Sequence, residues 1–245
     1  MALERLDKLL ASTGRWSRKE VKDLVRQGRV LVNGRPVLRS EEKWEPTETE
    51  LTVDGQRVDC APFVYLMLHK PAGLLSATED RDQRTVLDLL PEHLRRRGLF
   101  PVGRLDKDTE GLLLITDDGA LSHALMSPNR HVEKEYEAVV DGALAADAVL
   151  RFEQGMTLRD GTECKPAKLE ILETEPELRV RVTLKEGKYH QVKRMIAAVG
   201  GTVTALKRLR LGGLWLDKTL APGEFRELTQ EELEKYKYYY LDGNG

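Results

Sequence analysis

Acidic side chains recur at every second residue in the sequence DKDTEG, which begins at Asp106. Asp106, Asp108 and Glu110, followed by glycine, match the first half of an EF-hand calcium loop, which has oxygen ligands at positions one, three and five. Position twelve is Asp117, whose side chain is shorter than the bidentate glutamate usual there. The calcium ligand pattern is therefore only half complete.

The flanks of this loop also argue against calcium. An EF-hand loop lies between two helices, but Pro101 and Gly103 stand where the entering helix should run. The apolar run GLLLIT that follows is typical of a buried strand. Alternating charges between two apolar runs are typical of a solvated turn, so a solvated turn and a catalytic carboxylate remain as interpretations.

Other common chemistries lack their motifs. The sequence contains no GxxxxGK, GxSxG or HExxH, so phosphate-loop, serine-hydrolase and zinc-protease chemistry have no motif support. Carboxylates in a short loop can also act on a glycosidic bond, by stabilising or attacking an oxocarbenium-like sugar carbon. In a nucleic acid, that bond joins the base to the ribose.

Charge is divided unevenly along the chain. The first 39 residues contain ten basic and four acidic residues, a net charge of +6, so the remaining 206 residues carry −8 in a chain whose net charge is −2. This asymmetry indicates a basic module attached to a separate body, and a phosphate-rich partner.

The composition predicts a globular protein without a membrane association. The 245 residues are 40% hydrophobic, and no apolar run approaches the roughly 20 residues of a membrane span. Cys60 and Cys164 are too far apart in sequence to suggest a disulfide framework or a zinc pair. We expect a cytoplasmic monomer with reduced thiols.

The element pattern predicts two domains, a small basic module with its linker at residues 1–60 and a body at 61–245. In the module, two short helices precede the hairpin RVLVNGRPV, and Ser17 with Glu20 has the form of a capping box. In the body, strands such as FVYLMLHK, GLLLIT, EYEAVV, LRVRVTLK and LGGLWL outnumber the helices DGALSHALM, AADAVLRFEQ and YHQVKRMIAAVG. We therefore expect an α+β body with a mainly antiparallel mixed sheet, closed by a helix capped at Thr229 and Glu232.

Several long segments resemble one enzyme family. VGRLDKDTEGLLLITDDG is similar to the catalytic motif of pseudouridine synthases of the RsuA type, and HKPAGLLSATEDRDQRTVLDLL, VEKEYEAVV and EGKYHQVKRMIAAVGGTVTALKRLRLGGLWL are similar to other motifs of that family, in the same order. Residues 2 to about 45 resemble the alpha-L RNA-binding module of ribosomal protein S-four. The resemblance covers nearly the whole chain.

The resemblance implies roles for five residues. Asp106 would be the catalytic aspartate, which helps to break the bond between uracil and ribose either as a nucleophile or by removing a ribose proton, without a cofactor or metal. Tyr136 would stack on the target uracil, and Arg104 would displace the flipped base or hold a phosphate. The cation that keeps Asp106 ionised would come from HQVKRM, at Lys193 or alternatively at Arg194.

The basic module would bind RNA phosphates. We expect this contact from the side chains of its two helices and the turn between them, namely Arg15, Arg18, Lys19, Lys22 and Arg26.

The resemblance also suggests which RNA is modified. The segments STEDRDQRTVL, GKYHQVKRM and CKPAKLEI are more similar to the enzyme that modifies uridine 516 (rRNA numbering) of 16S rRNA, although DRDQRT departs from its form. The substrate would then be ribosomal RNA in a small-subunit assembly intermediate. An enzyme of 23S rRNA and a non-catalytic ribosome-assembly factor are the alternatives.

Overall fold

The computed structural model describes residues 3–46, 49–61 and 63–240, so residues 47 and 48 of the predicted linker lie outside it. The chain forms two compact units, one running to Val64 and including Leu87–Phe100, the other containing Tyr65–Val86 and continuing from Pro101. The predicted domain boundary at residue 60 stays a prediction, because these compact units are defined by contacts and are not continuous in sequence.

The first unit combines two helices with small antiparallel sheets. Its elements are α1 (Leu6–Ser12), α2 (Arg18–Arg26), the pair β1 (Glu4–Arg5) and β4 (Lys43–Trp44), and a sheet in the order β3-β2-β5-β6, with β3 (Arg35–Pro36), β2 (Val30–Val32), β5 (Leu51–Val53) and β6 (Gln56–Val58). A short helix, α3 (Glu92–Arg95), lies in the segment Leu87–Phe100. Apolar side chains of α1, α2, β2 and β5 share one buried core.

Local sequence signals of this unit have their expected conformations. The Ser17 hydroxyl accepts from the Glu20 amide and the Glu20 carboxylate accepts from the Ser17 amide, which confirms the capping box. Asn33 and Gly34 both have positive φ, 49° and 76°, as a two-residue hairpin turn between β2 and β3 requires.

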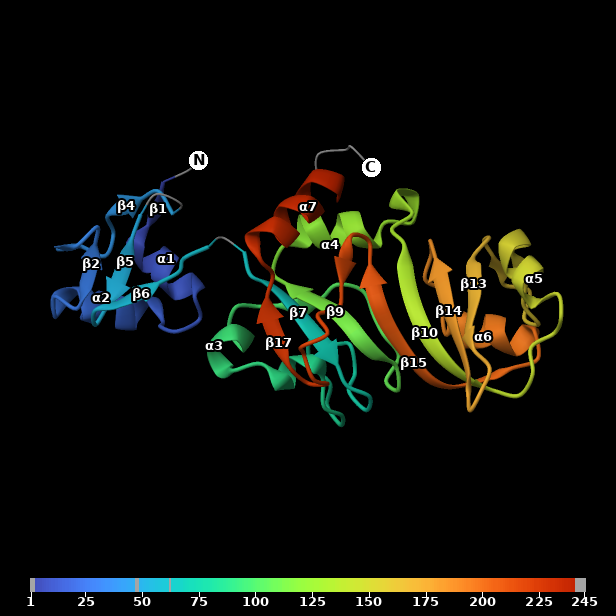
Figure 1. Cartoon of the computed structure of the whole chain (residues 1–245). Helices are drawn as coiled ribbons and strands as arrows, with labels where there is room; N and C mark the ends of the chain where they lie inside the picture. Colours follow the sequence, from blue (N-terminus) through green and yellow to red (C-terminus); the bar gives the residue numbers. More distant parts are fainter. Residues whose placement is uncertain (1–2, 47–48, 62, 241–245) are drawn as a thin grey trace. The chain divides into compact units, whose positions relative to one another are not determined.

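The second unit is built on one large sheet (Figure 1). Its strand order is β13-β14-β10-β15-β9-β7-β17, with β16 paired to β15 and β8 to β9. The strands are β7 (Tyr65–Lys70), β8 (Phe100–Pro101), β9 (Glu110–Thr116), β10 (Lys134–Asp141), β13 (Lys168–Glu173), β14 (Leu178–Leu184), β15 (Thr202–Leu211), β16 (Leu214–Trp215) and β17 (Phe225–Glu227). Strands β15 and β9 run parallel, while β7, β10, β13, β14, β16 and β17 pair antiparallel. The α+β prediction is confirmed.

Helices pack on this sheet at both ends. Those of the second unit are α4 (Gly119–Met126), α5 (Ala148–Gln154), α6 (Gln191–Ala198) and α7 (Gln230–Tyr240), with a 3₁₀ turn at Pro128–Arg130 and a two-stranded ribbon of β11 (Met156–Thr157) and β12 (Glu163–Cys164). A further 3₁₀ turn, Val86–Leu89, lies where the chain passes from the second unit to the first. Helix α5 packs on β13 and α6 on β15, whereas α4 and α7 contact each other near β7 and β9 (Figure 1). Leu121, Leu125 and Tyr236 of α4 and α7 share a core with Met67 and Leu112.

One predicted strand is wrong in its extent. The run LGGLWL is a hairpin, because Gly212 takes a positive φ of 58° and the chain turns between β15 and β16. The long strand that precedes this turn, β15, is not among the predicted strands, and its alternation of polar and apolar residues breaks at Ala205 and Leu206.

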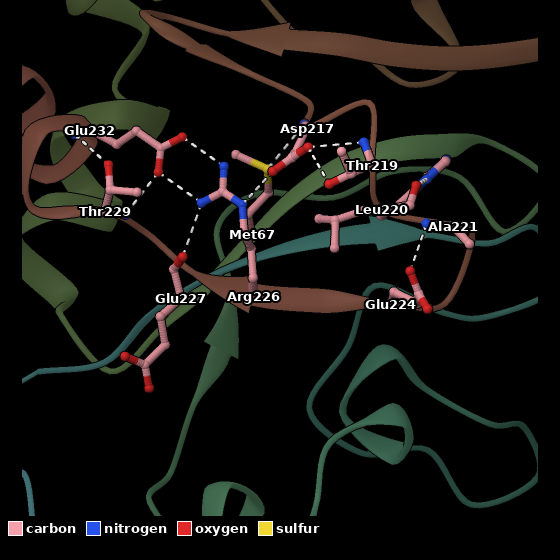
Figure 2. Close-up of polar contacts among 11 residues, drawn as sticks. Met67, Asp217, Thr219, Leu220, Ala221, Glu224, Arg226, Glu227, Thr229 and Glu232 are labelled. Atoms are coloured by element: carbon pink, nitrogen blue, oxygen red, sulfur yellow. Dashed lines mark hydrogen bonds and ion pairs between the residues drawn. The ribbon is translucent and has the colours of Figure 1, made fainter.

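The C-terminal helix is tied to the edge of the sheet by one arginine (Figure 2). Arg226 on β17 donates from Nε to Asp217 Oδ2 (2.7 Å) and from both Nη atoms to the Glu232 carboxylate (2.8 Å each). Hydrogen bonds from Thr219, together with the Arg226 guanidinium, lower the pKa of Asp217 to about 2. Glu232 also accepts from the Thr229 amide and donates its own amide to the Thr229 hydroxyl, which confirms the predicted capping box.

Candidate active site

Asp106 lies in a tight turn between β8 and β9. The Thr109 amide donates to the Asp106 carbonyl (3.0 Å), and the Asp106 side chain keeps 29% of its surface exposed. No group of three or more His, Cys, Asp or Glu residues suited to a metal ion occurs in the described part of the chain. Among the described residues, Asp106, Asp108 and Glu110 therefore do not form such a group.

The backbone of this turn is held from the end of β7 and the loop after it. The buried Lys70 ammonium donates to the carbonyls of Lys107 (3.1 Å) and Thr109 (2.9 Å). The Ser76 hydroxyl donates to the carbonyl of Leu105 (2.9 Å) and accepts from its amide (3.1 Å). These contacts hold the turn on both sides of Asp106, and the same burial lowers the pKa of Lys70 to about 8.

The glycine that ends DKDTEG allows two strands to approach closely. Gly111 has a φ of 106°, and a Cβ placed on it would lie 2.2 Å from the Arg208 carbonyl oxygen. A side chain here would separate β9 from β15, where Arg208 is in register with Gly111. The glycine therefore serves strand packing and brings Arg208 next to the Asp106 turn.

A pocket of about 330 Å³ opens beside this turn. Its walls come from residues 103–106, Thr109, Met126 at the end of α4, the strands β10, β14 and β15, and the start of α6 with the segment before it. Asp106, Tyr136 and Arg104 all line it, so the structure brings three of the predicted site residues together. Arg104 is exposed, whereas Tyr136 on β10 is only 9% exposed and lies opposite Arg208 of β15.

The two predicted counterions lie elsewhere. Lys193 Nζ is 2.6 Å from both carboxylate oxygens of Asp108, and Arg194 pairs with Asp160 and donates to the Thr162 hydroxyl (3.2 Å). Neither Lys193 nor Arg194 is among the residues that line the pocket. Both residues lie on the first turns of α6, and the rotation of that helix directs them to other carboxylates than Asp106.

A histidine lies beside Asp106 in the structure. His190 Nε2 lies 3.6 Å from Asp106 Oδ1, which makes an ion pair whenever the imidazole is protonated. His190 caps α6 with a left-handed backbone, φ 47° and ψ 35°, and its ring stacks on Tyr189 with centroids 3.8 Å apart. A non-glycine residue in this region is uncommon, and here the conformation places the imidazole at the pocket.

Three further cations line the pocket and were not predicted, Lys134, Lys188 and Arg208. Burial and, to a lesser extent, the charge of Arg208 lower the pKa of Lys134 to about 8. Lys134 could have been found from its spacing, because it lies two residues before Tyr136 on the same strand. Arg208 carries no such signal, since its position depends on the pairing of β15 with β9 and β10.

The five basic residues predicted to bind RNA are all exposed in the first unit. Four lie on α2, and Arg15 precedes it. Lys22 is 3.6 Å from Glu41 and Arg26 is 3.3 Å from Asp23, both at the surface, where ion pairs contribute little to stability.

None of the described helices is long and apolar enough to cross a membrane.

Comparison with known proteins agrees with this architecture. Residues 64–198 match the family model for RNA pseudouridylate synthase, and residues 4–45 match the S4 domain. An uncharacterized RNA pseudouridine synthase of Bacillus subtilis is 50% identical over 94% of this chain and 96% of its own. Ribosomal small subunit pseudouridine synthase A of Escherichia coli is 43% identical over 94% of this chain and 98% of its own.

A solved structure gives the same result. The crystal structure of a pseudouridylate synthase is 37% identical and aligns with a TM-score of 0.67, covering 95% of this chain and 99% of the other. The sequence motifs, the fold and these relatives agree. The chain belongs to the RNA pseudouridine synthase family, in the RsuA-type branch that carries an N-terminal S4 domain.

Proposed function

We propose that this protein isomerises uridine 516 of 16S rRNA to pseudouridine, with Asp106 as the catalytic carboxylate. The observation that carries the catalytic assignment is that Asp106, the base-stacking candidate Tyr136 and five basic side chains line one pocket of about 330 Å³. The 43% identity to the small-subunit synthase of Escherichia coli supports 16S rRNA as the substrate.

The geometry suits a base that has left its helix. A flipped uridine would place its ring against Tyr136, where stacking contributes about 1–3 kcal/mol per base, and its ribose toward Asp106. The Asp106 carboxylate then either bonds to the anomeric carbon or removes a ribose proton. The exposed Arg104 at the pocket wall is suited to the phosphate of the target nucleotide or to the place left by the flipped base.

Keeping Asp106 ionised requires positive charge nearby, because a closed pocket disfavours a lone carboxylate. We assign this role to His190, which lies 3.6 Å away, together with the other pocket cations. Lys193 can contribute only if it exchanges its present partner Asp108 when RNA binds. Lys193→Met with unchanged activity, beside a reduced rate for His190→Phe, would support this assignment.

The S4 domain would hold the rRNA through its phosphates. The exposed residues Arg15, Arg18, Lys19, Lys22 and Arg26 supply the charge for a contact with little base readout. We further propose that the protein acts as a monomer in the cytoplasm, on a small-subunit assembly intermediate. Activity on that particle and none on naked 16S rRNA would separate the two substrates.

Mapping pseudouridines in rRNA from cells that lack this protein tests the substrate. We expect uridine 516 to remain unmodified, and expression of the wild-type protein to restore the modification. Asp106→Asn should fail to restore it while binding rRNA with nearly unchanged affinity. A missing 23S rRNA pseudouridine beside an intact position 516 would overturn the proposed substrate, and activity in Asp106→Asn would overturn the catalytic assignment.

A further inference from the structure

Two buried polar atoms in the wall of the pocket have no partner among the described residues. They are Nη2 of Arg208 and the hydroxyl oxygen of Thr109, in side chains that are 2% and 1% exposed. Leaving a buried polar group unpaired costs about 1–3 kcal/mol, and native proteins have few such groups. Two of these atoms belong to residues that line one pocket, where a bound ligand can supply the missing partners.

The Arg208 guanidinium is hydrogen-bonded through Nε, whereas its buried Nη2 has no partner among the described residues. Its Nε donates to the carbonyl of Leu112 on the neighbouring strand β9 (2.8 Å), a buried contact. Gly111 permits this approach, because any side chain there would meet the Arg208 backbone. The guanidinium makes no ion pair with any residue that the structure describes, so its charge is buried without a carboxylate partner.

Thr109 likewise combines hydrogen-bonded backbone groups with an unpaired side chain. Its amide and carbonyl are both used, in the bonds with the Asp106 carbonyl and the Lys70 ammonium. Its hydroxyl is buried and unpaired, three residues after Asp106 in the same turn. The turn is therefore complete without this hydroxyl, and its hydrogen-bonding capacity is left for the pocket.

We propose that Arg208 is a further catalytic residue, whose Nη2 donates to a carbonyl oxygen of the target uracil, and that the Thr109 hydroxyl contacts the same ring edge. This inference rests on the proposed use of the pocket for a flipped uridine. A uracil ring offers two carbonyl oxygens as acceptors with an imide N–H between them. A guanidinium N–H matches a carbonyl oxygen, and a hydroxyl can accept from the imide.

A buried donor favours the base over a phosphate as the ligand. Arg208 lies opposite Tyr136 on the neighbouring strand, so a ring stacked on Tyr136 brings its edge near the guanidinium. A phosphate would remain near the exposed Arg104 at the pocket wall. The burial of Arg208 therefore suits the base, which is the part of the nucleotide that enters the pocket furthest.

The contact would strengthen during the reaction. When the bond between C1′ and N1 breaks, its electron pair stays on the uracil ring and is delocalised over N1 and the two carbonyl oxygens. C5 then bonds to C1′, the C5 proton is lost and N1 gains a proton, so the product is an isomer of the substrate. A fixed cation at a carbonyl oxygen stabilises the ring while it carries negative charge, the kind of contact that contributes about 10²–10³ in rate.

Arg208→Gln and Thr109→Val test the proposal in the full-length protein with 16S rRNA. We expect Arg208→Gln to slow single-turnover pseudouridine formation about 10²–10³-fold, with the Kd for RNA changed less than threefold. Thr109→Val should slow it about tenfold while the melting temperature stays equal or rises, because the lost hydroxyl has no partner in the protein. Arg210→Gln, on the same strand but outside the pocket, and Thr52→Val, whose hydroxyl is also unpaired, are the matched controls.

RNA carrying 2-thiouridine or 4-thiouridine at the target identifies the carbonyl. Sulfur accepts hydrogen bonds weakly, so the wild type should slow on one of the two RNAs, and Arg208→Gln should not slow further on that RNA. If Arg208→Gln does not fold, the rate of Thr109→Val and the wild-type rates on both thio-substituted RNAs test the proposed contact. A wild type that is active on normal RNA and equally active on both thio RNAs overturns the Arg208 contact and leaves the proposed function intact. A wild type without activity on 16S rRNA refutes the proposed function instead.

Discussion

Replacing Lys70 by methionine tests whether the end of β7 fixes the catalytic turn. Lys70 is fully buried, and its ammonium donates to the carbonyls of Pro71 (2.9 Å), Lys107 (3.1 Å) and Thr109 (2.9 Å). Methionine has a similar volume but donates no hydrogen bond. The Lys107 carbonyl would keep the Gly73 amide (2.7 Å), while the other two lose the contact to Lys70.

The structure sets the expected magnitude. An acceptor left unpaired in the interior costs about 1–3 kcal/mol. The bond to the Thr109 carbonyl is buried, whereas those to Pro71 and Lys107 are partly buried, so water can replace part of what they lose. We expect Lys70→Met to lower the free energy of unfolding by about 2–4 kcal/mol at pH 7.

The pH dependence of this difference identifies the ammonium as its cause. Burial lowers the pKa of Lys70 from 10.5 to about 8, so between these pH values the unfolded state binds more protons than the folded state. Stability due to Lys70 therefore rises with pH in this window. Relative to Lys70→Met, the wild type should gain about 1.3 kcal/mol between pH 7 and pH 9.

Urea denaturation at both pH values measures these differences, with Lys218→Met as an exposed control. In single-turnover assays, Lys70→Met should slow pseudouridine formation with little change in RNA affinity, because the turn loses its support while the RNA-binding surface is untouched. Equal stability of the two proteins at pH 7, or a difference that stays constant up to pH 9, would refute the reasoning.

Three further predictions concern other charges. Because burial lowers the pKa of Lys134 to about 8, kcat/KM of the wild type should fall about tenfold from pH 7 to pH 9 if its charge is required, and Lys134→Arg should remove that component of the fall. Lys19→Glu with Lys22→Glu should weaken rRNA binding and reduce the slope of log Kd against log salt by about 0.7–0.9 per lost phosphate contact, whereas an unchanged slope would exclude them from the interface. Arg226→Met should lower the melting temperature at pH 7, and the deficit should shrink as pH falls from 4 toward 2, because Asp217, whose pKa is about 2, and its neighbours then lose charge; a constant deficit would contradict this.

Local sequence signals fixed much of the fold in advance. The capping boxes at Ser17 and Thr229 and the Asn33 turn depend on residues within a few positions of one another, and each has its predicted form. The apolar runs likewise identified β7, β9, β10 and β14, because burial on a sheet selects residue types directly. Motif order, by resemblance, was sufficient to identify the family.

The composition of the pocket depended on tertiary structure. The sequence by itself singled out Asp106 and Tyr136, but the register of β15 against β9 and β10 places Arg208 beside them, about a hundred residues from Asp106. The rotation of α6 sends Lys193 to Asp108, and the left-handed backbone of His190 brings an imidazole to Asp106 instead. The amino-acid sequence shows which side chains can carry charge. Long-range strand pairing and helix orientation decide which of these side chains share a pocket, because local sequence does not determine where a side chain points relative to distant strands.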